Sequence, residues 1–315
     1  MQYKQIFNRS DCLSNSTVYV TMTKVTFMNY ILLLDKPKDY TSRDIVNIVG
    51  KKLGTKKIGH TGTLDPIATG VLVLCVGNAT KMVEIITALE KEYIADIILG
   101  TKTDTGDITG NVVEEQMAIY SKQEIEQACH KMIKTYEQTV PIYSAVKVNG
   151  KKLYSYAREG KDVQLPTREV TIHSLECLGE PVYEKGKTII QIRTLVSKGT
   201  YIRSLIEDLA CTLHTIGTMS SLRRIKQGEY YIEDCNTLED IESGNFQLHN
   251  YSHILSKYPA ITVDSYLEKR IRNGSILENR YQTSVILFQD QHKNPLALYR
   301  VYEKDNTKIK PWKML

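Results

Sequence analysis

One glycine-rich segment gathers a carboxylate, a histidine and several hydroxyl side chains. Residues 59–66 read Gly-His-Thr-Gly-Thr-Leu-Asp-Pro, and Thr69 and Gly70 follow shortly after. Glycine lets a backbone approach a ligand closely or adopt a positive φ, and the following proline biases Asp65 toward an extended conformation. The apolar run at 71–76 predicts a buried strand directly behind the segment. These residues suit a single acid held rigidly for catalysis at the end of a strand, but they also suit a turn whose aspartate caps the backbone.

Further blocks of sequence surround this segment in a definite order, and together they carry a family resemblance. The blocks are DKP at 35–37 with TS at 41–42, KEY at 91–93 leading to LGTKTDTGD at 99–107, PIYSAVKVNG at 141–150, and SKGTYIR at 197–203 with LRR at 222–224. With GHTGTLDPIATGVL at 59–72, they resemble the TruB-type family of tRNA pseudouridine synthases, which act on uridine 55 in the T loop. The resemblance covers about residues 30–235.

The resemblance implies an isomerase with one catalytic carboxylate. Pseudouridine formation breaks the glycosidic C–N bond of uridine, turns the freed uracil and rejoins it through C5 without redox change, so neither a metal nor a cofactor is expected. Asp65 is then the nucleophile, or the base that starts elimination at the ribose. Arg203 is implied as its partner, because a guanidinium offers a planar fork to a carboxylate. Tyr93 is implied as the tyrosine that stacks on the uracil and assists proton removal at C5.

The other site residues are expected to bind the RNA substrate. A uridine inside the T loop must be flipped out to be reached, and His60 is implied to stack on neighbouring bases and fill the vacated space. Tyr201 is the second tyrosine of the pocket, and the backbone of Leu222 is implied to contact the uracil edge. Thr61 is counted with the substrate-binding residues, and so is Lys36, a lysine near the pocket that supports its structure.

Residues 141–168 are predicted to form a loop-like segment rich in basic and aromatic side chains. The cations are Lys147, Lys151, Lys152, Arg158, Lys161 and Arg168, and the tyrosines are Tyr143, Tyr154 and Tyr156. This mixture suits RNA, whose phosphates pair with cations and whose bases stack on rings, although a solvated charged loop has a similar composition. The resemblance identifies the segment as the family's mobile thumb, with Lys147 among the substrate-binding residues.

Two positions depart from the pattern of the family. Asp39 stands where the family commonly has glycine, and Ile142 stands where a second proline is usual. Aspartate tolerates left-handed backbone geometry, so we expect a small change in the turn at Asp39. The loss of a proline at Ile142 predicts a looser hinge for the thumb.

Caps and periodicity predict the elements that must hold these residues. The expected helices are one from Thr41-Ser42 to a stop at Gly54, one at 81–91, one after a Ser121–Glu124 capping box, and one at 202–213. The expected strands lie near 71–76, 93–99, 170–177 and 188–196. Because helices and strands do not alternate regularly, the fold class is α+β. The resemblance implies a mixed, mostly antiparallel central sheet with flanking helices.

The length of 315 residues allows one large or two ordinary domains. Residues 1–28 precede the family's usual starting point, so we expect a disordered leader or an over-extended start, or else an edge strand at 18–20. Residues 29–250 are expected to form the catalytic domain. Residues 258–315 are expected to form a small, strand-rich, PUA-like RNA-binding domain.

The charge of the chain is concentrated near its end. Residues 250–315 contain 11 Lys and Arg against 6 Asp and Glu, whereas the preceding residues contain 30 of each, so this end carries the whole net charge of +5. A basic terminal unit on a neutral body suggests a second contact with a polyanion, or else an ordinary solubilising surface.

The composition also limits the compartment and the partners. No apolar run approaches the ~20 residues that span a bilayer, and residues 1–28 lack the apolar core of a signal peptide. Six cysteines occur without a C-x-x-C pair, which predicts neither a zinc cage nor a disulfide framework and favours the cytoplasm. The expected partner is tRNA, bound through its T-stem loop by a monomer without membrane or metal.

Other functional classes compete with this interpretation. A catalytically silent tRNA-binding chaperone on the same scaffold is the main alternative, although binding alone requires no carboxylate that faces a polyanion. A glycosidase normally needs two carboxylates flanking the bond, and only Asp65 lies in the signature segment. A P-loop enzyme is excluded because the chain contains no G-x-x-x-x-G-K-[ST] motif.

Overall fold

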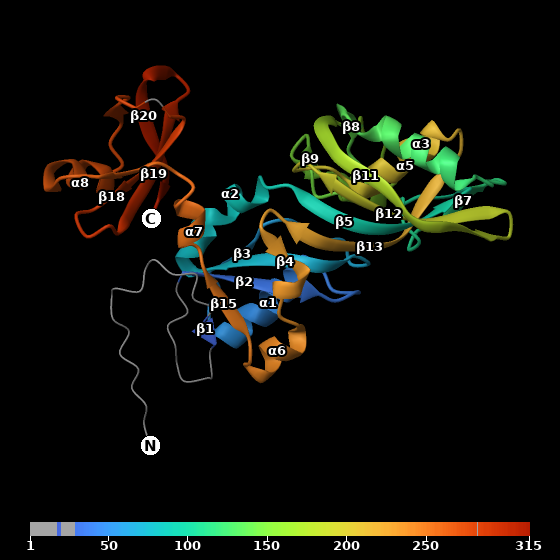
Figure 1. The fold of residues 1–315 in the computed structure, drawn as a ribbon, viewed down its shortest axis with the longest axis horizontal. Coiled ribbons are helices and arrows are strands. Elements are labelled where there is room, and N and C mark those ends of the chain that lie inside the picture. Colours follow the sequence, from blue (N-terminus) through green and yellow to red (C-terminus); the bar gives the residue numbers. More distant parts are fainter. Residues whose placement is uncertain (1–17, 20–28, 282) are drawn as a thin grey trace.

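The computed structural model describes residues 18–19, 29–281 and 283–315. An 11-stranded sheet runs through the main body (Figure 1). Its spatial order is β1 (Val18–Tyr19), β15 (Gln247–Asn250), β2 (Tyr30–Lys36), β4 (Thr69–Val76), β13 (Gly217–Gln227), β5 (Lys91–Leu99), β12 (Lys187–Val196), β11 (Thr167–Glu184) and β8 (Thr135–Thr139). In addition, β3 (Ile58–His60) pairs with β4, and β14 (Tyr230–Tyr231) pairs with β13.

The sheet is mixed but mostly antiparallel, as predicted. Among its described strand pairs, β4 and β13 run parallel, with Arg223 opposite Thr69 and Arg224 opposite Gly70. The other pairs are antiparallel. Strand β13 therefore lies between β4 and β5, two strands that precede it by more than a hundred residues in the chain.

The helices lie in separate groups, with α8 beside the C-terminal strands and α4 next to β10 (Lys151–Lys152) (Figure 1). They are α1 (Ser42–Leu53), α2 (Val83–Thr87), α3 (Lys122–Met132), α4 (Leu153–Arg158), α5 (Ile202–Thr212), α6 (Leu238–Ser243), α7 (Ser252–Leu255) and α8 (Ser265–Arg272), with 3-10 turns η1 (Gly77–Met82) and η2 (Ile232–Asp234). One buried cluster joins α1 and α6 to β2, β4 and β15, and includes Ile45, Leu72 and Ile241. A second joins α3 and α5 to β5, β11, β12 and β13. Each cluster thus packs a pair of helices against one half of the main sheet.

Local sequence accounts for the ends of α1 and α3. Thr41 accepts a hydrogen bond from the amide of Asp44, and the Asp44 carboxylate accepts one from the Thr41 amide. Gly54 ends α1 in the left-handed region at φ 64°. Ser121 and Glu124 form the same capping box on α3, which satisfies amides that would otherwise lack partners. The predicted starts of both helices are confirmed.

The helix predicted over 81–91 was wrong in its extent. Residues 77–82 form the 3-10 turn η1, and only Val83–Thr87 are α-helical. Lys91 already belongs to β5, where it lies opposite Gln227 and Val196. The helix therefore ends at Thr87, and pairing with strands on both sides of β5 begins at Lys91. The backbone at Asp39 is left-handed, with a φ of 69°, and the small change expected in this turn stays a prediction.

The thumb segment at 141–168 contains more regular structure than the loop that was predicted. Its β9 (Lys147–Val148) and β10 (Lys151–Lys152) form a short hairpin, which leads into α4. A second hairpin, β6 (Thr101–Thr103) with β7 (Val112–Glu115), follows β5. Both hairpins project from the half of the sheet that contains β5, and their bases border the site described below.

The chain ends in a second, five-stranded sheet. Its order is β16 (Ala260–Thr262), β18 (Val285–Gln289), β19 (Pro295–Tyr302), β20 (Asp305–Met314) and β17 (Leu277–Glu278). Leu287 and Leu298 of this sheet join a buried cluster with Ile31 and Val71 of the main body. Trp312 Nε1 donates to Glu84 of α2 at 3.4 Å, and Lys313 pairs with the same carboxylate. The strand-rich end is thus packed against α2 and the main sheet.

Only a small part of the expected leader can be described. Val18 and Tyr19 pair with Leu248 and Gln247 of β15 and so form the edge strand β1. The edge-strand alternative therefore holds at these two residues. The rest of residues 1–28 lies outside the described residues.

Candidate active site

Asp65, in the loop between β3 and β4, forms an ion pair with Arg203 in the first turn of α5. Oδ2 of Asp65 lies 3.0 Å from Nε of Arg203. The arginine side chain is 6% exposed and the aspartate 35% exposed. The carboxylate is therefore held from the inside by a buried cation, while its outer side remains open to a ligand. The ion pair thus joins a buried positive charge to a carboxylate that a ligand can reach.

Two backbone carbonyls complete the environment of Arg203. Its Nη1 donates to the carbonyl of Thr105 at 2.9 Å and its Nη2 to the carbonyl of Tyr143 at 2.9 Å. Thr105 follows β6, and Tyr143 lies at the start of the thumb. Because all three nitrogens of the guanidinium have a partner, its plane is fixed before substrate arrives. A fixed guanidinium can hold the carboxylate of Asp65 in one direction.

Two buried side chains of β13 hold the first half of the glycine-rich segment. Arg224, 1% exposed, donates from Nε to the carbonyl of Val71 at 2.7 Å and from Nη2 to that of Gly62 at 3.1 Å. Nε2 of Gln227 donates to Thr61 Oγ1 at 2.9 Å and to the Thr61 carbonyl at 3.1 Å. These bonds fix the backbone before Asp65.

The strand pairing also requires glycine at position 70. A Cβ built on Gly70 would lie 2.1 Å from the carbonyl oxygen of Arg224, and its φ is 103°. Any side chain at this position would push β13 away from β4. Gly70 therefore allows the close contact that places Arg224 beneath the segment.

The structure places Thr61 and Lys36, both counted with the substrate-binding residues, inside the protein. Both side chains are fully buried, at 0% exposure, and therefore present no surface to a substrate. Thr61 is bonded to Gln227, and Lys36 Nζ donates to the carbonyls of Tyr40 at 2.7 Å and Pro66 at 3.3 Å. Both support the segment around Asp65, a role that was expected for Lys36 but not for Thr61. Burial lowers the pKa of Lys36 to about 8, against the opposing effect of the nearby Asp65 carboxylate.

Tyr93 and Leu222 lie on the adjacent strands β5 and β13. They are 6% and 7% exposed, and both belong to the buried cluster that also contains Leu64, the residue before Asp65. Tyr93 lies directly opposite Arg224 in the register of the two strands. The two residues therefore border the glycine-rich segment, and their predicted contacts with uracil stay predictions.

Tyr201 precedes α5 and is held by its backbone. Its amide donates to Oε1 of Gln138 at 2.8 Å, and its carbonyl accepts from Nε2 of the same side chain at 3.2 Å. Gln138 is 1% exposed. The guanidinium of Arg168 lies over the Tyr201 ring, 6.0 Å from its centroid. The ring thus stands half-buried two residues before Arg203.

His60 and Lys147 lie toward the periphery of the site. His60 is half-buried on β3, and its pKa is lowered by burial and then by the positive charges of Arg43 and Arg224. Its Nδ1 is buried and has no hydrogen-bond partner among the described residues. These features favour a neutral imidazole. Lys147 is exposed on β9 of the thumb.

Comparison with known proteins bears on this arrangement. The family model "TruB family pseudouridylate synthase (N terminal domain)" matches residues 50–202. A tRNA pseudouridine synthase B of Bacillus cereus (strain ZK / E33L) is 41% identical over 300 residues, which cover 91% of this chain and 97% of that protein. The chain belongs to the TruB family. A tRNA pseudouridine synthase B of Acholeplasma laidlawii (strain PG-8A) is 38% identical over 274 residues, 86% of this chain and 95% of that one.

Solved structures share the fold at lower identity. An H/ACA RNP bound to a substrate RNA containing 2'-deoxyuridine aligns with a TM-score of 0.62 and 20% identity, over 90% of this chain and 84% of that one. An archaeal box H/ACA sRNP Nop10-Cbf5 complex aligns with a TM-score of 0.60 and 19% identity, over 92% and 89%. This TruB-family chain therefore shares its fold with chains of these H/ACA particles.

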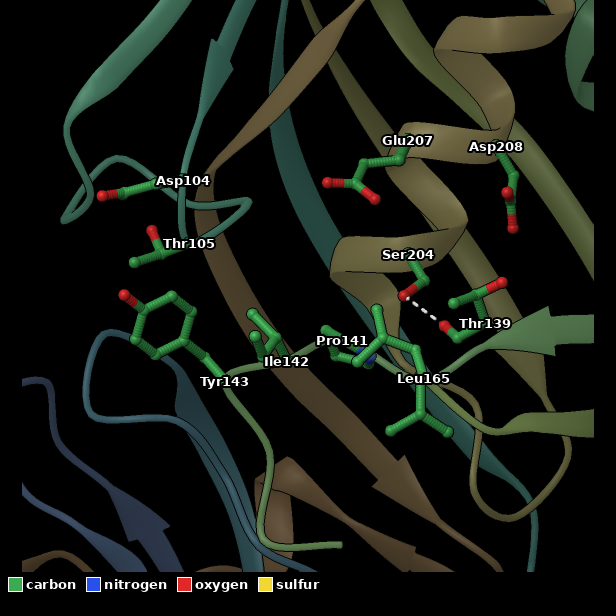
Figure 2. A pocket seen from close by; sticks show the side chains of 11 residues that line it. Asp104, Thr105, Thr139, Pro141, Ile142, Tyr143, Leu165, Ser204, Glu207 and Asp208 are labelled. Carbon is green, nitrogen blue, oxygen red and sulfur yellow. Dashed lines mark hydrogen bonds between the residues drawn. The ribbon is translucent and has the colours of Figure 1, made fainter. Parts of the chain in front are cut away.

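A small cavity lies at the base of the thumb (Figure 2). Its volume is about 160 Å³, and Thr105 and Tyr143, whose carbonyls bind Arg203, both line it. Ser204 and Glu207 of α5 line another side, and Ser204 Oγ donates to the carbonyl of Thr139 at 2.9 Å. Burial raises the pKa of Glu207. The cavity therefore lies between the base of the thumb and α5.

The sequence did not assign functions to Arg224 and Gln227. Arg224 belongs to the Leu-Arg-Arg motif at 222–224, but the motif was used to predict a role for Leu222 only. Gln227 carried no such signal, because a single glutamine within a strand is common.

Across the part of the chain that the structure describes, no helix has the length and apolarity to cross a membrane. Within the same residues, no group of His, Cys, Asp and Glu has the arrangement of a metal site.

Proposed function

We propose that this TruB-family protein is a tRNA pseudouridine synthase that isomerises uridine 55 in the T loop of tRNAs. The observation that carries the proposal is the pair of a half-open Asp65 and a buried Arg203 at 3.0 Å, within a chain 41% identical to a tRNA pseudouridine synthase B. A chaperone that only binds tRNA gains nothing from an ionised carboxylate facing a polyanion. The pair therefore favours catalysis over the alternative of binding alone.

The reaction needs one carboxylate and conserves every atom of the nucleotide. The bond between N1 of uracil and C1′ of ribose breaks, the bond between C5 and C1′ forms, and the proton lost from C5 is balanced by one gained at N1. Asp65 acts as the nucleophile that opens the first step. Arg203 holds the carboxylate in the orientation that attack requires. Tyr93 stacks on the detached uracil and accepts the C5 proton.

Access to the target requires base flipping. A neutral, half-buried His60 can occupy the space left by the base without adding charge to the stack. Tyr201 and the backbone of Leu222 form other sides of the pocket for the flipped uridine. The thumb at 141–168, which carries Lys147, closes over the T-stem loop.

The C-terminal sheet supplies a second contact with the tRNA. We assign residues 29–250 to the catalytic domain and 258–315 to a PUA-like RNA-binding domain, since the latter carries the excess of basic residues. A monomer in the cytoplasm, where tRNA is present, completes the proposal. The isolated cysteines are consistent with that compartment.

Mapping of pseudouridine in an unmodified elongator tRNA transcript tests the proposed function. After incubation with the purified protein, mass spectrometry should locate one new pseudouridine at position 55. Asp65→Asn, a neutral side chain of the same shape, should yield none and bind the tRNA within a few-fold of the unaltered protein. A transcript with cytidine at position 55 controls for modification elsewhere. Product from Asp65→Asn would end the nucleophile assignment, and product only at other positions would end the assignment to uridine 55.

A further inference from the structure

The side chain of Ser42 binds both backbone polar groups of Leu64, the residue immediately before Asp65. Its Oγ accepts from the Leu64 amide at 2.9 Å and donates to the Leu64 carbonyl at 3.3 Å. Ser42 is 2% exposed and Leu64 is 3% exposed, so water does not compete for these bonds. A single hydroxyl thus acts as the hydrogen-bond partner that a neighbouring strand would otherwise provide.

The helix start fixes the position of Ser42 independently of the site. Ser42 is the first residue of α1, and the cap of this helix is supplied by Thr41, whose Oγ1 accepts from the Asp44 amide at 3.1 Å. The carboxylate of Asp44 in turn accepts from the Thr41 amide at 2.9 Å. The Ser42 hydroxyl is therefore not used in capping. It points instead from a rigid helix end into the glycine-rich segment.

The backbone after Asp65 is held in a similar manner. The carbonyl of Pro66 accepts from the amide of Asp39 at 2.8 Å and from Lys36 Nζ at 3.3 Å. Ser42 is then the group that fixes the residue before the carboxylate, on the side where the segment has no paired strand. Side chains that hold the backbone of a reacting group set its direction within the tolerance that catalysis requires.

We propose that Ser42 is a positioning residue for Asp65, an inference that rests on the proposed function of this site. Ser42 does not touch the uridine. It holds the Leu64 peptide so that the Asp65 carboxylate stays in line with Arg203 when RNA binds. Loss of the hydroxyl leaves the Leu64 amide buried without a partner, which the segment relieves by moving. Movement of this peptide displaces the carboxylate that follows it.

The test compares Ser42→Ala with Ser121→Ala. Both remove one serine hydroxyl at the start of a helix, but Ser121 caps α3 and has no contact with the glycine-rich segment. Ser42→Ala should lower the single-turnover rate of pseudouridine formation roughly 10- to 100-fold and leave the tRNA dissociation constant within about threefold. Ser121→Ala should leave both unchanged. Ser42→Cys keeps the size of the side chain but is a poor hydrogen-bonding group, so it should share the defect without opening a cavity.

A second measurement does not depend on activity. The amide of Leu64 should exchange its hydrogen slowly in the unaltered protein and in Ser121→Ala, and at least about tenfold faster in Ser42→Ala and Ser42→Cys. A single-turnover rate within twofold of the unaltered protein in both Ser42 variants would overturn the inference. If the unaltered protein forms no pseudouridine, the proposed function has failed. Unchanged protection of the Leu64 amide in both Ser42 variants would then overturn the positioning role by itself.

Discussion

Nη2 of Arg203 donates to the carbonyl oxygen of Tyr143 at 2.9 Å, so the arginine beside Asp65 is bonded directly to the start of the thumb. Its Nε holds the carboxylate at the same time. A displacement of the thumb base therefore acts on the same guanidinium that orients Asp65. RNA contact and carboxylate geometry are connected through one side chain.

Arg203→Lys should keep the positive charge but lose the fork of bonds. A lysine ammonium cannot reach Asp65, Thr105 and Tyr143 in one plane. We expect the single-turnover rate to fall by about 100-fold or more, while the tRNA dissociation constant stays within about threefold. Arg193→Lys is the matched control, because Arg193 pairs with Glu92 on an exposed part of β12. Equal rates for Arg203→Lys and the unaltered protein would contradict the orienting role.

Tyr93→Phe separates stacking from proton transfer. The phenyl ring retains the stacking surface, worth roughly 1–3 kcal/mol per base in single-strand binders, but it lacks the hydroxyl. This variant should bind tRNA nearly normally and stall before deprotonation at C5, whereas Tyr93→Ala should lose both properties. Single-turnover assays with 5-deuterated uridine RNA provide the measurement. A normal rate without an isotope effect in Tyr93→Phe would leave Tyr93 as a stacking surface only.

The buried Lys36 should make stability depend on pH in alkaline solution. Its pKa of about 8 in the folded protein lies below its ordinary value of 10.5. Between these values the unfolded chain binds more protons, so the free energy of unfolding rises with pH. Relative to Lys36→Met, the unaltered protein should gain on the order of 2 kcal/mol between about pH 8 and pH 10.

Urea unfolding of both proteins across this range tests the contribution of Lys36. Burial also lowers the pKa of Lys91 to about 8. Lys91 is present in both proteins, so its effect cancels in the difference. Parallel stability curves for the two proteins would show that Lys36 has an ordinary pKa.

Thumb cations should appear in the salt dependence of tRNA binding. Lys147 is exposed, and Lys152 lies 5.4 Å from the centroid of the Tyr154 ring, where a phosphate and a base could both be bound. Replacing both lysines by alanine should weaken binding and reduce the slope of log K against log salt by up to about 2. Lys122→Ala is the control, because Lys122 lies on α3, outside the thumb, and pairs with Glu180 of β11. An unchanged slope in the double variant would exclude these phosphate contacts.

The contribution of the C-terminal sheet is better tested by charge removal than by truncation. Deleting residues 258–315 would uncover the apolar cluster that Leu287 and Leu298 share with the main body. Lys269 and Arg270 are exposed on α8, and their replacement by alanine leaves that cluster intact. Affinity for tRNA should fall more than the rate at saturating substrate. If affinity and salt slope match those of the unaltered protein, α8 is not an RNA contact.

Local signals in the sequence were sufficient for the longer helices. Capping boxes marked the starts of α1 and α3, and a glycine marked the end of α1, because these features act within a single turn. The segment 81–91 was mispredicted because its apolar spacing does not reveal the pairing of Lys91 with two strands. That pairing depends on residues more than a hundred positions away. Likewise, hydrophobic periodicity contained nothing that would place β13 parallel to β4.

The candidate site was predictable where a motif named the residue. Asp65 and Arg203 were expected as partners, and the structure brings them to 3.0 Å. The supports of the segment were not expected, since Ser42, Arg224 and Gln227 act through the backbone of their partners. A hydrogen bond to a carbonyl can be made by many residue types and leaves no distinctive pattern in a single sequence. Burial alone distinguished Thr61 and Lys36 from residues that face a ligand.

The insertion of β13 between β4 and β5 has a consequence for synthesis on the ribosome. Both neighbouring strands emerge long before residues 217–227, and at about 5–20 residues per second the delay is on the order of ten seconds. During this interval each half-sheet exposes an unpaired strand edge, which is a template for aggregation. Nascent chains paused before residue 217 should therefore bind chaperones at the ribosome. Chains that extend past residue 227 and have left the exit tunnel with that segment should release these chaperones.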